Sequence, residues 1–315
     1  MSRVREIKAV ILGLICILAS FLSNADAQSV SDAYQTETFT AGDAPSVDIR
    51  TSGGHIEVKA HGDDEIRVEM YVRKGSRYYK PSDADLSEYE IDISQDGDVV
   101  TASASRESSG VWNWFRSGRD YAISFRVLVP ERTLVEGRTS GGHISAENIS
   151  NNVNLRTSGG HVRVAQIEGD ANLRTSGGHI EIERLTGTVD ARTSGGRIEA
   201  KSVDGDLDLR TSGGGITLNE ISGSVAARTS GGTIRSDIRE LTGDVNLRTS
   251  GGSIHIELPS GLGYDLDLRG NRVNVDLVNF TGTSERGRIS GSMNGGGQTV
   301  HARTSGGSVN VNFSE

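Results

Sequence analysis

The sequence predicts an all-β protein: a single-stack β-solenoid of parallel strands, with 18 residues per coil and an irregular N-terminal cap. The first observation is a pentapeptide, Arg-Thr-Ser-Gly-Gly, that occurs nine times. The second is its spacing, which is 18 residues at five successive steps, then 20 and finally 55. The third is the alternation of apolar and polar residues around each copy. The copies begin at Arg50, Arg138, Arg156, Arg174, Arg192, Arg210, Arg228, Arg248 and Arg303.

The repeat that contains Arg156 shows how one coil is expected to fold. Residues 153–158 alternate, so that their apolar side chains share one face, which is typical of a strand with one buried side. After the glycines, the apolar positions Val162 and Val164 lie one step out of phase. Such a slip would turn the second strand inside out unless the chain bends. Gly159-Gly160 is therefore the predicted corner, because two residues without a Cβ allow a bend.

A second corner is expected to close each coil at one glycine, namely Gly169, Gly187, Gly205, Gly223 or Gly243. Inward side chains then repeat in three columns: Ile144, Val162, Ile180, Ile198, Ile216, Ile234; Val153, Ala171, Val189, Leu207, Val225, Val245; and Thr139, Thr157, Thr175, Thr193, Thr211, Thr229, Thr249. One coil cannot bury its apolar face alone, whereas stacked coils share a continuous core. Parallel strands about 4.8 Å apart would pair residue i with residue i+18.

Other repeat architectures fit less well. A propeller needs units about twice as long, and a leucine-rich repeat needs its Leu/Asn consensus. A calcium-binding nonapeptide roll needs Gly-Gly-x-Gly-x-Asp. The repeats contain neither consensus.

Residues 1–27 are predicted to be a secretory signal peptide. Basic residues precede an apolar run from Ala9 to Leu22, and Ala25-Asp26-Ala27 forms a small-x-small cleavage site. The run is shorter than the about 20 residues of a transmembrane helix, so no transmembrane segment is expected in the mature chain. We expect export by the Sec route, with a periplasmic and a cell-surface or extracellular location both open.

The mature chain, from Gln28, contains no cysteine, because Cys16 lies in the predicted signal. Hydrogen-bonded ladders and core packing are therefore expected to stabilise it without disulfides. It would hold 30 basic and 40 acidic residues, a net charge of −10, so nucleic acid is not an expected partner. The periodic apolar positions exclude a disordered chain.

Three segments are expected after the signal. Residues 28–137 form an irregular N-terminal β cap, with strands at 65–72, 89–93, 99–103 and 121–129 and two polar or aromatic insertions between them. Residues 138–257 form the regular 18-residue coils, and residues 258–315 continue the solenoid to a C-terminal cap. The sequence leaves the handedness and the oligomeric state open.

The repeats resemble a known family. A leading Val-x-Ile strand, Thr-Ser-Gly-Gly-x-Ile corners, a Val-Leu-Val-Pro-Glu link at residues 127–131 and a closing Arg-Thr-Ser-Gly-Gly-Ser-Val unit are similar to the bacterial putative adhesin family. This family consists of exported β-solenoids of unknown function related to auto-transporter adhesin head domains. The resemblance spans roughly residues 47–311 and implies the fold and an envelope location, but no active site.

Stacking predicts a row of arginines about 4.8 Å apart, each pair repelling by roughly 1 kcal/mol in water before salt screening. The row consists of Arg138, Arg156, Arg174, Arg192, Arg210, Arg228 and Arg248. Two interpretations stay open: the guanidinium groups stack and donate to loop carbonyls, or they form a strip that binds an anionic polysaccharide or another cell-surface component. Asp190 and Asp208, two residues earlier on the same face, are candidate counter-charges.

Two further groups are candidates for binding. His143, His161 and His179 occupy one column and are weak candidates for a Zn²⁺ site, because a straight column converges poorly on a metal. Trp112, Trp114 and Phe115, with Tyr78-Tyr79 as expected neighbours, would form either a lid over the open end of the solenoid or an exposed binding platform.

No enzymatic motif is apparent. The sequence has no nucleophile elbow, no His-Glu-x-x-His and no phosphate-binding loop, so no catalytic residue and no cofactor is expected. The favoured function is that of an exported, non-enzymatic adhesin or scaffold that binds through its repetitive outer faces. The alternative is a carbohydrate-active β-helix enzyme, a lyase or hydrolase with paired carboxylates.

Overall fold

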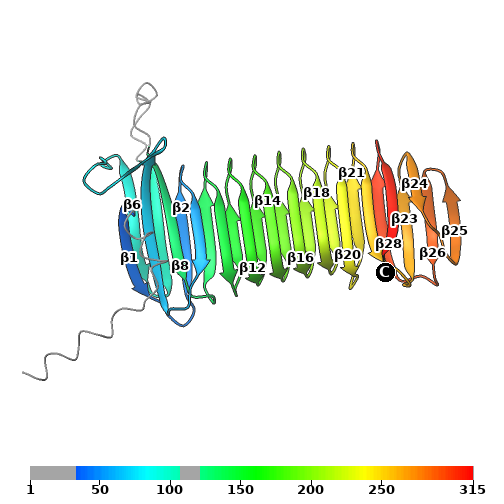
Figure 1. Ribbon diagram of the computed structural model, residues 1–315, viewed down its shortest axis with the longest axis horizontal. Coiled ribbons are helices and arrows are strands. Elements are labelled where there is room, and N and C mark those ends of the chain that lie inside the picture. The colour runs from blue at the N-terminus through cyan, green and yellow to red at the C-terminus, as the bar shows by residue number, and fades with distance from the viewer. Residues whose placement is uncertain (1–32, 107–120, 315) are drawn as a thin grey trace, which may run out of the picture.

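The computed structural model describes residues 33–106 and 121–314. Within these ranges the chain forms 28 strands and no helix, and the strands make two 14-stranded sheets. The sheets face each other along an elongated rod, with successive coils stacked along its long axis (Figure 1). Most neighbouring strands run parallel, which confirms the all-β class and the parallel pairing. The predicted signal peptide lies outside the described residues.

The first sheet, here called sheet A, contains the strands that follow the Ser-Gly-Gly corners. Its strands are β1 (Gln35–Thr40), β4 (Glu65–Lys74), β5 (Arg77–Tyr79), β8 (Ala122–Val129), β3 (Ile56–Ala60), β10 (Ile144–Ile149), β12 (Val162–Glu168), β14 (Ile180–Thr186), β16 (Ile198–Asp204), β18 (Ile216–Ser222), β20 (Ile234–Glu240), β22 (Ile254–Pro259), β28 (Ser308–Ser314) and β24 (Arg272–Val275).

The second sheet, sheet B, contains the strands that end in the repeated arginines. Its strands are β25 (Phe280–Glu285), β26 (Arg288–Met293), β23 (Tyr264–Arg269), β27 (Gln298–Thr304), β21 (Val245–Thr249), β19 (Val225–Arg228), β17 (Leu207–Arg210), β15 (Val189–Arg192), β13 (Ala171–Arg174), β11 (Val153–Arg156), β9 (Leu134–Thr139), β2 (Ser46–Thr51), β7 (Val99–Arg106) and β6 (Tyr89–Asp96).

The strand register confirms the expected neighbours. Leu155 lies beside Leu173 in sheet B, and Val162 lies beside Ile180 in sheet A. Each of these pairs is 18 positions apart in the sequence, and the same offset recurs from β9 to β19 in sheet B. The coil after Arg228 is two residues longer, and the pairing of β18 with β20 shows a register shift there.

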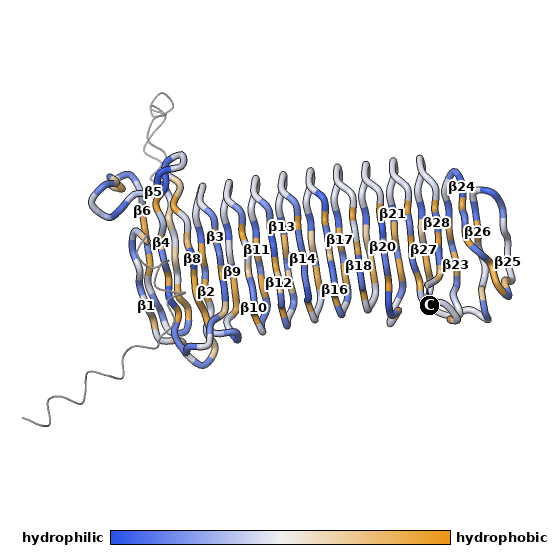
Figure 2. Tube along the Cα trace, in the orientation of Figure 1, coloured by the Kyte–Doolittle hydropathy of each residue, from blue (hydrophilic) through white to orange (hydrophobic). Residues whose placement is uncertain are grey.

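The core is the narrow space between the two sheets. All three predicted inward columns are buried, including the threonines Thr139, Thr157, Thr175, Thr193, Thr211, Thr229 and Thr249. Figure 2 shows apolar and polar residues alternating along the strands in every coil. The core therefore runs along the rod without interruption, as a stack of coils requires.

A buried hydroxyl fixes each Ser-Gly-Gly corner. Thr175 Oγ1 donates a hydrogen bond to the carbonyl oxygen of Gly160 in the preceding coil (2.8 Å) and accepts one from the N–H of Gly178 (3.2 Å). The same pair of bonds occurs at Thr157 and Thr193. Threonine thus satisfies two backbone groups at a buried position, where valine would leave both unpaired.

At this corner, only the second position of the Gly-Gly pair must be glycine, because neighbouring coils approach each other closely there. A Cβ at Gly160 would lie 1.9 Å from the carbonyl oxygen of Gly142, whereas a Cβ at Gly159 would have no heavy atom nearer than 3.6 Å. The predicted corner at Gly159-Gly160 is confirmed, since the chain bends at both glycines, and close approach adds a requirement at the second one alone. The coils approach each other so closely at the second position that no side chain fits.

The second half of each coil contains a kink that the alternation did not predict. Gln166, in the middle of β12, has a left-handed backbone with φ of 57°. The kink lets Ile167 point inward three positions after Val164 rather than two. Equivalent left-handed residues are Asn148, Arg184, Ser202 and Glu220. The predicted glycine corners follow at Gly169, Gly187, Gly205 and Gly223, all with positive φ, and Gly243 lies in a bend of the lengthened coil without one.

Neither end continues the stack in chain order, which differs from the continuous solenoid expected at the C-terminal end. β27, which contains Arg303, pairs directly with β21, and β28 pairs directly with β22, so residues 264–293 lie further out. These residues form β23, β24 and the antiparallel strands β26 and β25. At the other end, β2 pairs with β9, and the four strands predicted between residues 65 and 129 form as β4, β6, β7 and β8 on the outer side of that pair (Figure 1).

Candidate functional site

The arginines form one row along the outer face of sheet B. The strand register places Arg156 beside Arg174 and Arg138, and this pairing continues in both directions. The row extends beyond the predicted seven, because Arg50 pairs with Arg138, and Arg303 lies between Arg248 and Arg269. In spatial order its members from the pentapeptides and the degraded copy are Arg269, Arg303, Arg248, Arg228, Arg210, Arg192, Arg174, Arg156, Arg138 and Arg50, and Arg288 of β26 lies beside Arg269.

The three additional arginines had signals in the sequence. Arg50 and Arg303 begin copies of the pentapeptide, and Leu268-Arg269-Gly270 is a degraded copy. The sequence spacing did not show that they join the row, because 88 residues separate Arg50 from Arg138 and 55 separate Arg248 from Arg303. Arg50 and Arg303 join the row because the strands that separate them from Arg138 and Arg248 in the sequence lie further out along the rod.

Carboxylates two residues earlier on the same strands neutralise half of the row. Arg192 contacts Asp190 (2.9 Å), and Arg210 contacts Asp208 (2.8 Å). Arg192 also reaches Asp208 in the next coil (3.8 Å). Both predicted counter-charges thus pair with the row. Further pairs are Arg50 with Asp48, Arg138 with Glu136 (3.4 Å), Arg174 with Asp190 (3.8 Å) and Arg269 with Asp267 (3.1 Å).

The remaining arginines have no carboxylate. Within the described residues, the side chains of Arg156, Arg228 and Arg303 form no ion pair and no hydrogen bond, and all three are exposed. Asn154 and Ala226 occupy the positions two residues earlier, from which a carboxylate could pair with Arg156 and Arg228. The row therefore carries a surplus of positive charge in a protein whose net charge is −9.

A groove of about 920 Å³ lies over the N-terminal end of the row. Four row arginines line it, namely Arg50, Arg138, Arg156 and Arg174. Amides, hydroxyls and one carboxylate, that of Asp92, make up most of the remaining lining, with Asn154 and Asn172 between the arginines. The groove combines charged fork-shaped donors with neutral donors, which suits carboxylate or phosphate oxygens.

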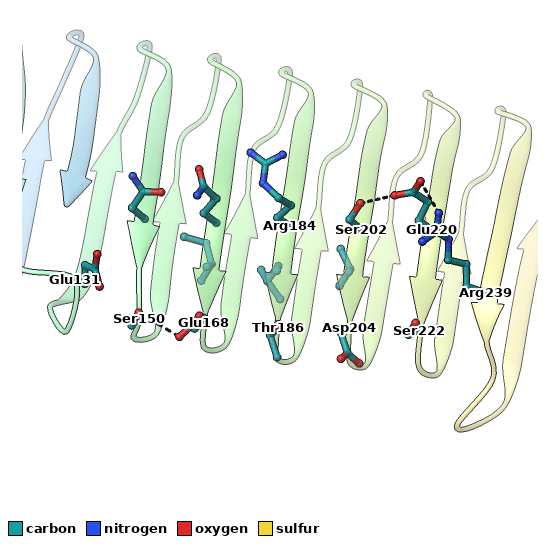
Figure 3. A pocket seen from close by; sticks show the side chains of 15 residues that line it. Glu131, Ser150, Glu168, Arg184, Thr186, Ser202, Asp204, Glu220, Ser222 and Arg239 are labelled. Carbon is teal, nitrogen blue, oxygen red and sulfur yellow. Dashed lines mark hydrogen bonds and ion pairs between the residues drawn. The ribbon is translucent and has the colours of Figure 1, made fainter. Parts of the chain in front are cut away.

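A second groove, of about 510 Å³, crosses the outer face of sheet A. It follows the kinks, here called the kink column: Asn148, Gln166, Arg184, Ser202 and Glu220. Figure 3 shows Arg184, Ser202 and Glu220 side by side in successive coils, with Ser150, Glu168, Thr186, Asp204 and Ser222 in a parallel row nearer the corner. Sequence reasoning missed this groove, although the change from a two-residue to a three-residue apolar step between Val164 and Ile167 was its signal.

Hydrogen bonds hold one end of this second groove. Ser202 Oγ donates to Glu220 Oε2 (2.6 Å), and Arg239 contacts Glu220 Oε1 (2.8 Å; Figure 3). The bond from Ser202, followed by the charge of Arg239, lowers the pKa of Glu220 below its usual value. Glu220 is thus held ionised and oriented as an acceptor.

The sequence comparisons identify the family. A family model described as Toastrack DUF4097, a domain of unknown function, matches residues 44–312. The chain belongs to this family. The match covers most of the described fold and confirms the resemblance drawn from the repeats. No curated protein matches the sequence.

Several solved structures are similar to this Toastrack chain. One is a putative cell adhesion protein from Clostridium sporogenes (9% identity, covering 89% of this chain and 99% of that one, TM-score 0.24). Another is a putative adhesin from Bacteroides fragilis (11%, 89% and 96%, 0.33). A third is described as a putative lipid binding protein from Parabacteroides distasonis (16%, 88% and 96%, 0.40).

In the Toastrack chain the histidine column contains His55 as well as the three predicted members. The rings stack in parallel, with centroids 5.0, 4.7 and 4.8 Å apart. Each ring accepts a hydrogen bond at Nδ1 from the backbone N–H of the next coil, as His161 does from His179 (2.8 Å). The accepting Nδ1 carries no proton, so each neutral ring holds its proton on Nε2.

This arrangement does not fit the weak zinc hypothesis. Stacked rings direct their nitrogens along parallel lines, whereas Zn²⁺ needs ligands that converge on one point. Within residues 33–106 and 121–314 no group of three or more His, Cys, Asp or Glu side chains could hold a metal ion.

No helix of the described Toastrack fold is long and apolar enough to cross a membrane.

The histidine column predicts a loss of stability in mild acid. Burial lowers the pKa of His55, His143 and His179 below 6.5. The charge of His143 lowers the pKa of His55 further, that of His161 lowers the pKa of His143, and that of Arg197 lowers the pKa of His179. The unfolded chain therefore takes up these protons first as the pH falls. We expect the neutral histidine column to contribute fully to the free energy of unfolding above about pH 6.5, and this contribution to fall progressively below that pH.

The measurement is the melting temperature, Tm, between about pH 7.5 and pH 5. A variant with His55→Asn, His143→Asn and His179→Asn keeps an acceptor for each backbone N–H but removes the titrating rings. It should show a smaller fall in Tm over this range than the native Toastrack chain. Equal pH profiles for the two proteins would contradict the assignment.

The predicted aromatic cluster is described only in part. Trp112, Trp114 and Phe115 lie outside the described residues. Tyr78 packs edge-on against Tyr71 (centroids 6.5 Å apart), and Tyr79 against Tyr121 (5.3 Å). Tyr78 is 59% exposed, whereas Tyr79 packs against the core. The choice between lid and platform stays a prediction.

Proposed function

We propose that the protein is an exported, non-enzymatic Toastrack solenoid, a single stack of 18-residue coils, that binds anionic polysaccharides of the cell envelope along its arginine row. The observation that carries this proposal is the register that aligns ten arginines on one face, of which Arg156, Arg228 and Arg303 have no partner within the described residues. Export and an envelope location rest on the predicted signal at residues 1–27.

A polymeric anion suits this face better than a small one. Neighbouring guanidinium groups about 4.8 Å apart repel each other. A polymer with regularly spaced carboxylates or phosphates would reach Arg156, Arg228 and Arg303 together and relieve the repulsion that the carboxylates of the row leave. Guanidinium binds such groups with two parallel hydrogen bonds. Binding would also release counterions, so affinity should fall steeply with salt.

The row is suited to binding rather than to chemistry. Arginine keeps its proton at physiological pH, so it supplies neither a general acid nor a general base. The row carboxylates Asp190 and Asp208 are tied to arginines by ion pairs. This supports an adhesin or scaffold rather than the lyase or hydrolase considered as the alternative.

The test is a calorimetric titration of residues 28–315 with polygalacturonate and with its fully methyl-esterified form. We expect the charged polymer to bind at about 50 mM salt, and the affinity to fall by at least tenfold at about 500 mM. The esterified polymer has the same backbone without charge and should bind far more weakly. Equal affinity for both polymers, or release of reducing sugar from the charged one, would refute the proposal.

A further inference from the structure

The kink column contains side chains where glycine would be the relaxed choice. Five successive coils have a non-glycine residue with φ between 54° and 61°: Asn148, Gln166, Arg184, Ser202 and Glu220. For L-residues this left-handed conformation is unfavourable, although asparagine tolerates it better than the others. The strain recurs at the same position in each coil, so it is a feature of the repeat.

The same coils use glycine at their other left-handed position. Gly169, Gly187, Gly205 and Gly223 occupy the corners, where a Cβ would lie within 2.6 Å of backbone atoms. Glycine is therefore available to this sequence wherever it is required. Retaining polar side chains in the kink column at a conformational cost indicates that the side chains themselves have a use.

Those side chains line the groove on sheet A, and several present free hydrogen-bonding groups. The amides of Asn148 and Gln166 form no side-chain hydrogen bond with any other described residue. Next to them lie the hydroxyls of Thr186 and Ser222, and that of Ser150, which donates to Glu168 (3.4 Å). The groove thus offers donors and acceptors in two parallel rows that repeat once per coil (Figure 3).

The charge of this groove disfavours the polyanions proposed for the other face. Its lining includes four carboxylates, Glu131, Glu168, Asp204 and Glu220, against the two cations Arg184 and Arg239. One of those cations, Arg239, is bound to Glu220, and Arg184 is bound to Glu183. Carboxylates, amides and hydroxyls instead complement the hydroxyl groups of an uncharged sugar.

The coil spacing matches such a ligand. Successive coils repeat about every 4.8 Å, which is close to the length of one pyranose unit in an extended chain. An oligosaccharide lying along the rod would therefore meet one kink-column side chain per sugar. We propose that the groove over the kink column binds an uncharged, extended oligosaccharide along the long axis of the solenoid.

The test uses glycine to remove the side chains without harming the fold. In a variant with Asn148→Gly, Gln166→Gly and Ser202→Gly, glycine suits the left-handed backbone, so Tm should be unchanged or higher. The probes are three extended oligosaccharides, cellohexaose, β-1,4-linked mannohexaose and the hexamer of β-1,4-linked N-acetylglucosamine, titrated calorimetrically into residues 28–315. We expect at least one probe to bind the native chain and the glycine variant to bind it at least tenfold more weakly.

A control variant has Glu181→Ala, Glu199→Ala and Thr217→Ala on the groove strands β14, β16 and β18 but outside the groove lining, and it should bind like the native chain. Absence of binding for all three probes, or equal affinity of the native and glycine chains, would overturn the proposal. The glycine variant should keep its affinity for polygalacturonate, because the arginine row lies on sheet B. A failure of either site is thus distinguishable from a failure of the other.

Discussion

Replacing Gly178 with alanine should destabilise the protein strongly, whereas the same change at Gly177 should have little effect. A Cβ at Gly178 would lie 1.8 Å from the carbonyl oxygen of Gly160, which is backbone of the preceding coil. That oxygen also accepts the hydrogen bond of Thr175, so it cannot move without breaking a buried bond. We expect a loss of about 3 kcal/mol in the free energy of unfolding, from overpacking together with the disturbed hydrogen bonds.

Gly177→Ala is the matched control. A Cβ there would meet its nearest atoms at 3.7 Å, which is an ordinary contact. The expected change is within about 1 kcal/mol. Urea unfolding of both variants and the native chain, followed by circular dichroism, measures the difference. Equal losses for the two variants would show that the coils do not approach each other at the second glycine as described.

Neutralising the unpaired arginines should produce the largest loss of polyanion binding. We expect the variant with Arg156→Gln, Arg228→Gln and Arg303→Gln to bind polygalacturonate at least tenfold more weakly than the native chain, because the guanidinium donors of these residues are free to capture carboxylates. Each lost contact should also reduce the slope of log affinity against log salt by about 0.7 to 0.9.

The control for net charge lies on the opposite face. Arg163→Gln, Arg197→Gln and Arg235→Gln remove the same number of positive charges from in or beside the strands of sheet A. The net charge changes equally in both variants, so a larger loss of affinity in the row variant shows that the polymer lies against the row and does not merely respond to net charge. If the two variants lose affinity to the same extent, the arginine row is not the binding surface.

Much of the fold could be predicted because the repeat period fixes the neighbours. Parallel strands with an 18-residue offset place Ile180 beside Val162 whatever the details of the corners. The buried threonines followed from alternation alone, but their hydrogen bonds to the preceding coil did not. Likewise, the different roles of the two glycines depend on distances between coils, which no pattern within one coil contains.

The kink column and the ends of the rod were harder to predict. A strand with one left-handed residue keeps most of its alternation, so the extra step before Ile167 resembles ordinary variation. The interval of 55 residues before Arg303 says nothing about whether those residues lie within the stack or beyond it. The arginine row was therefore predicted in its middle and missed at its ends, and the second groove was missed entirely.

The most direct test of the account is a pair of engineered cysteines, because residues 28–315 contain none. Asn172 lies beside Asp190 in the strand register, so Asn172→Cys with Asp190→Cys places two Cα atoms about 4.8 Å apart, within disulfide range. Asn172→Cys with Asp208→Cys spans two coils, about 9.6 Å, which is too far. We predict an intramolecular disulfide in the first protein and free thiols in the second, by mass spectrometry after mild oxidation. Free thiols in the first, or equal cross-linking in both, would contradict the stacking on which both grooves and the arginine row depend.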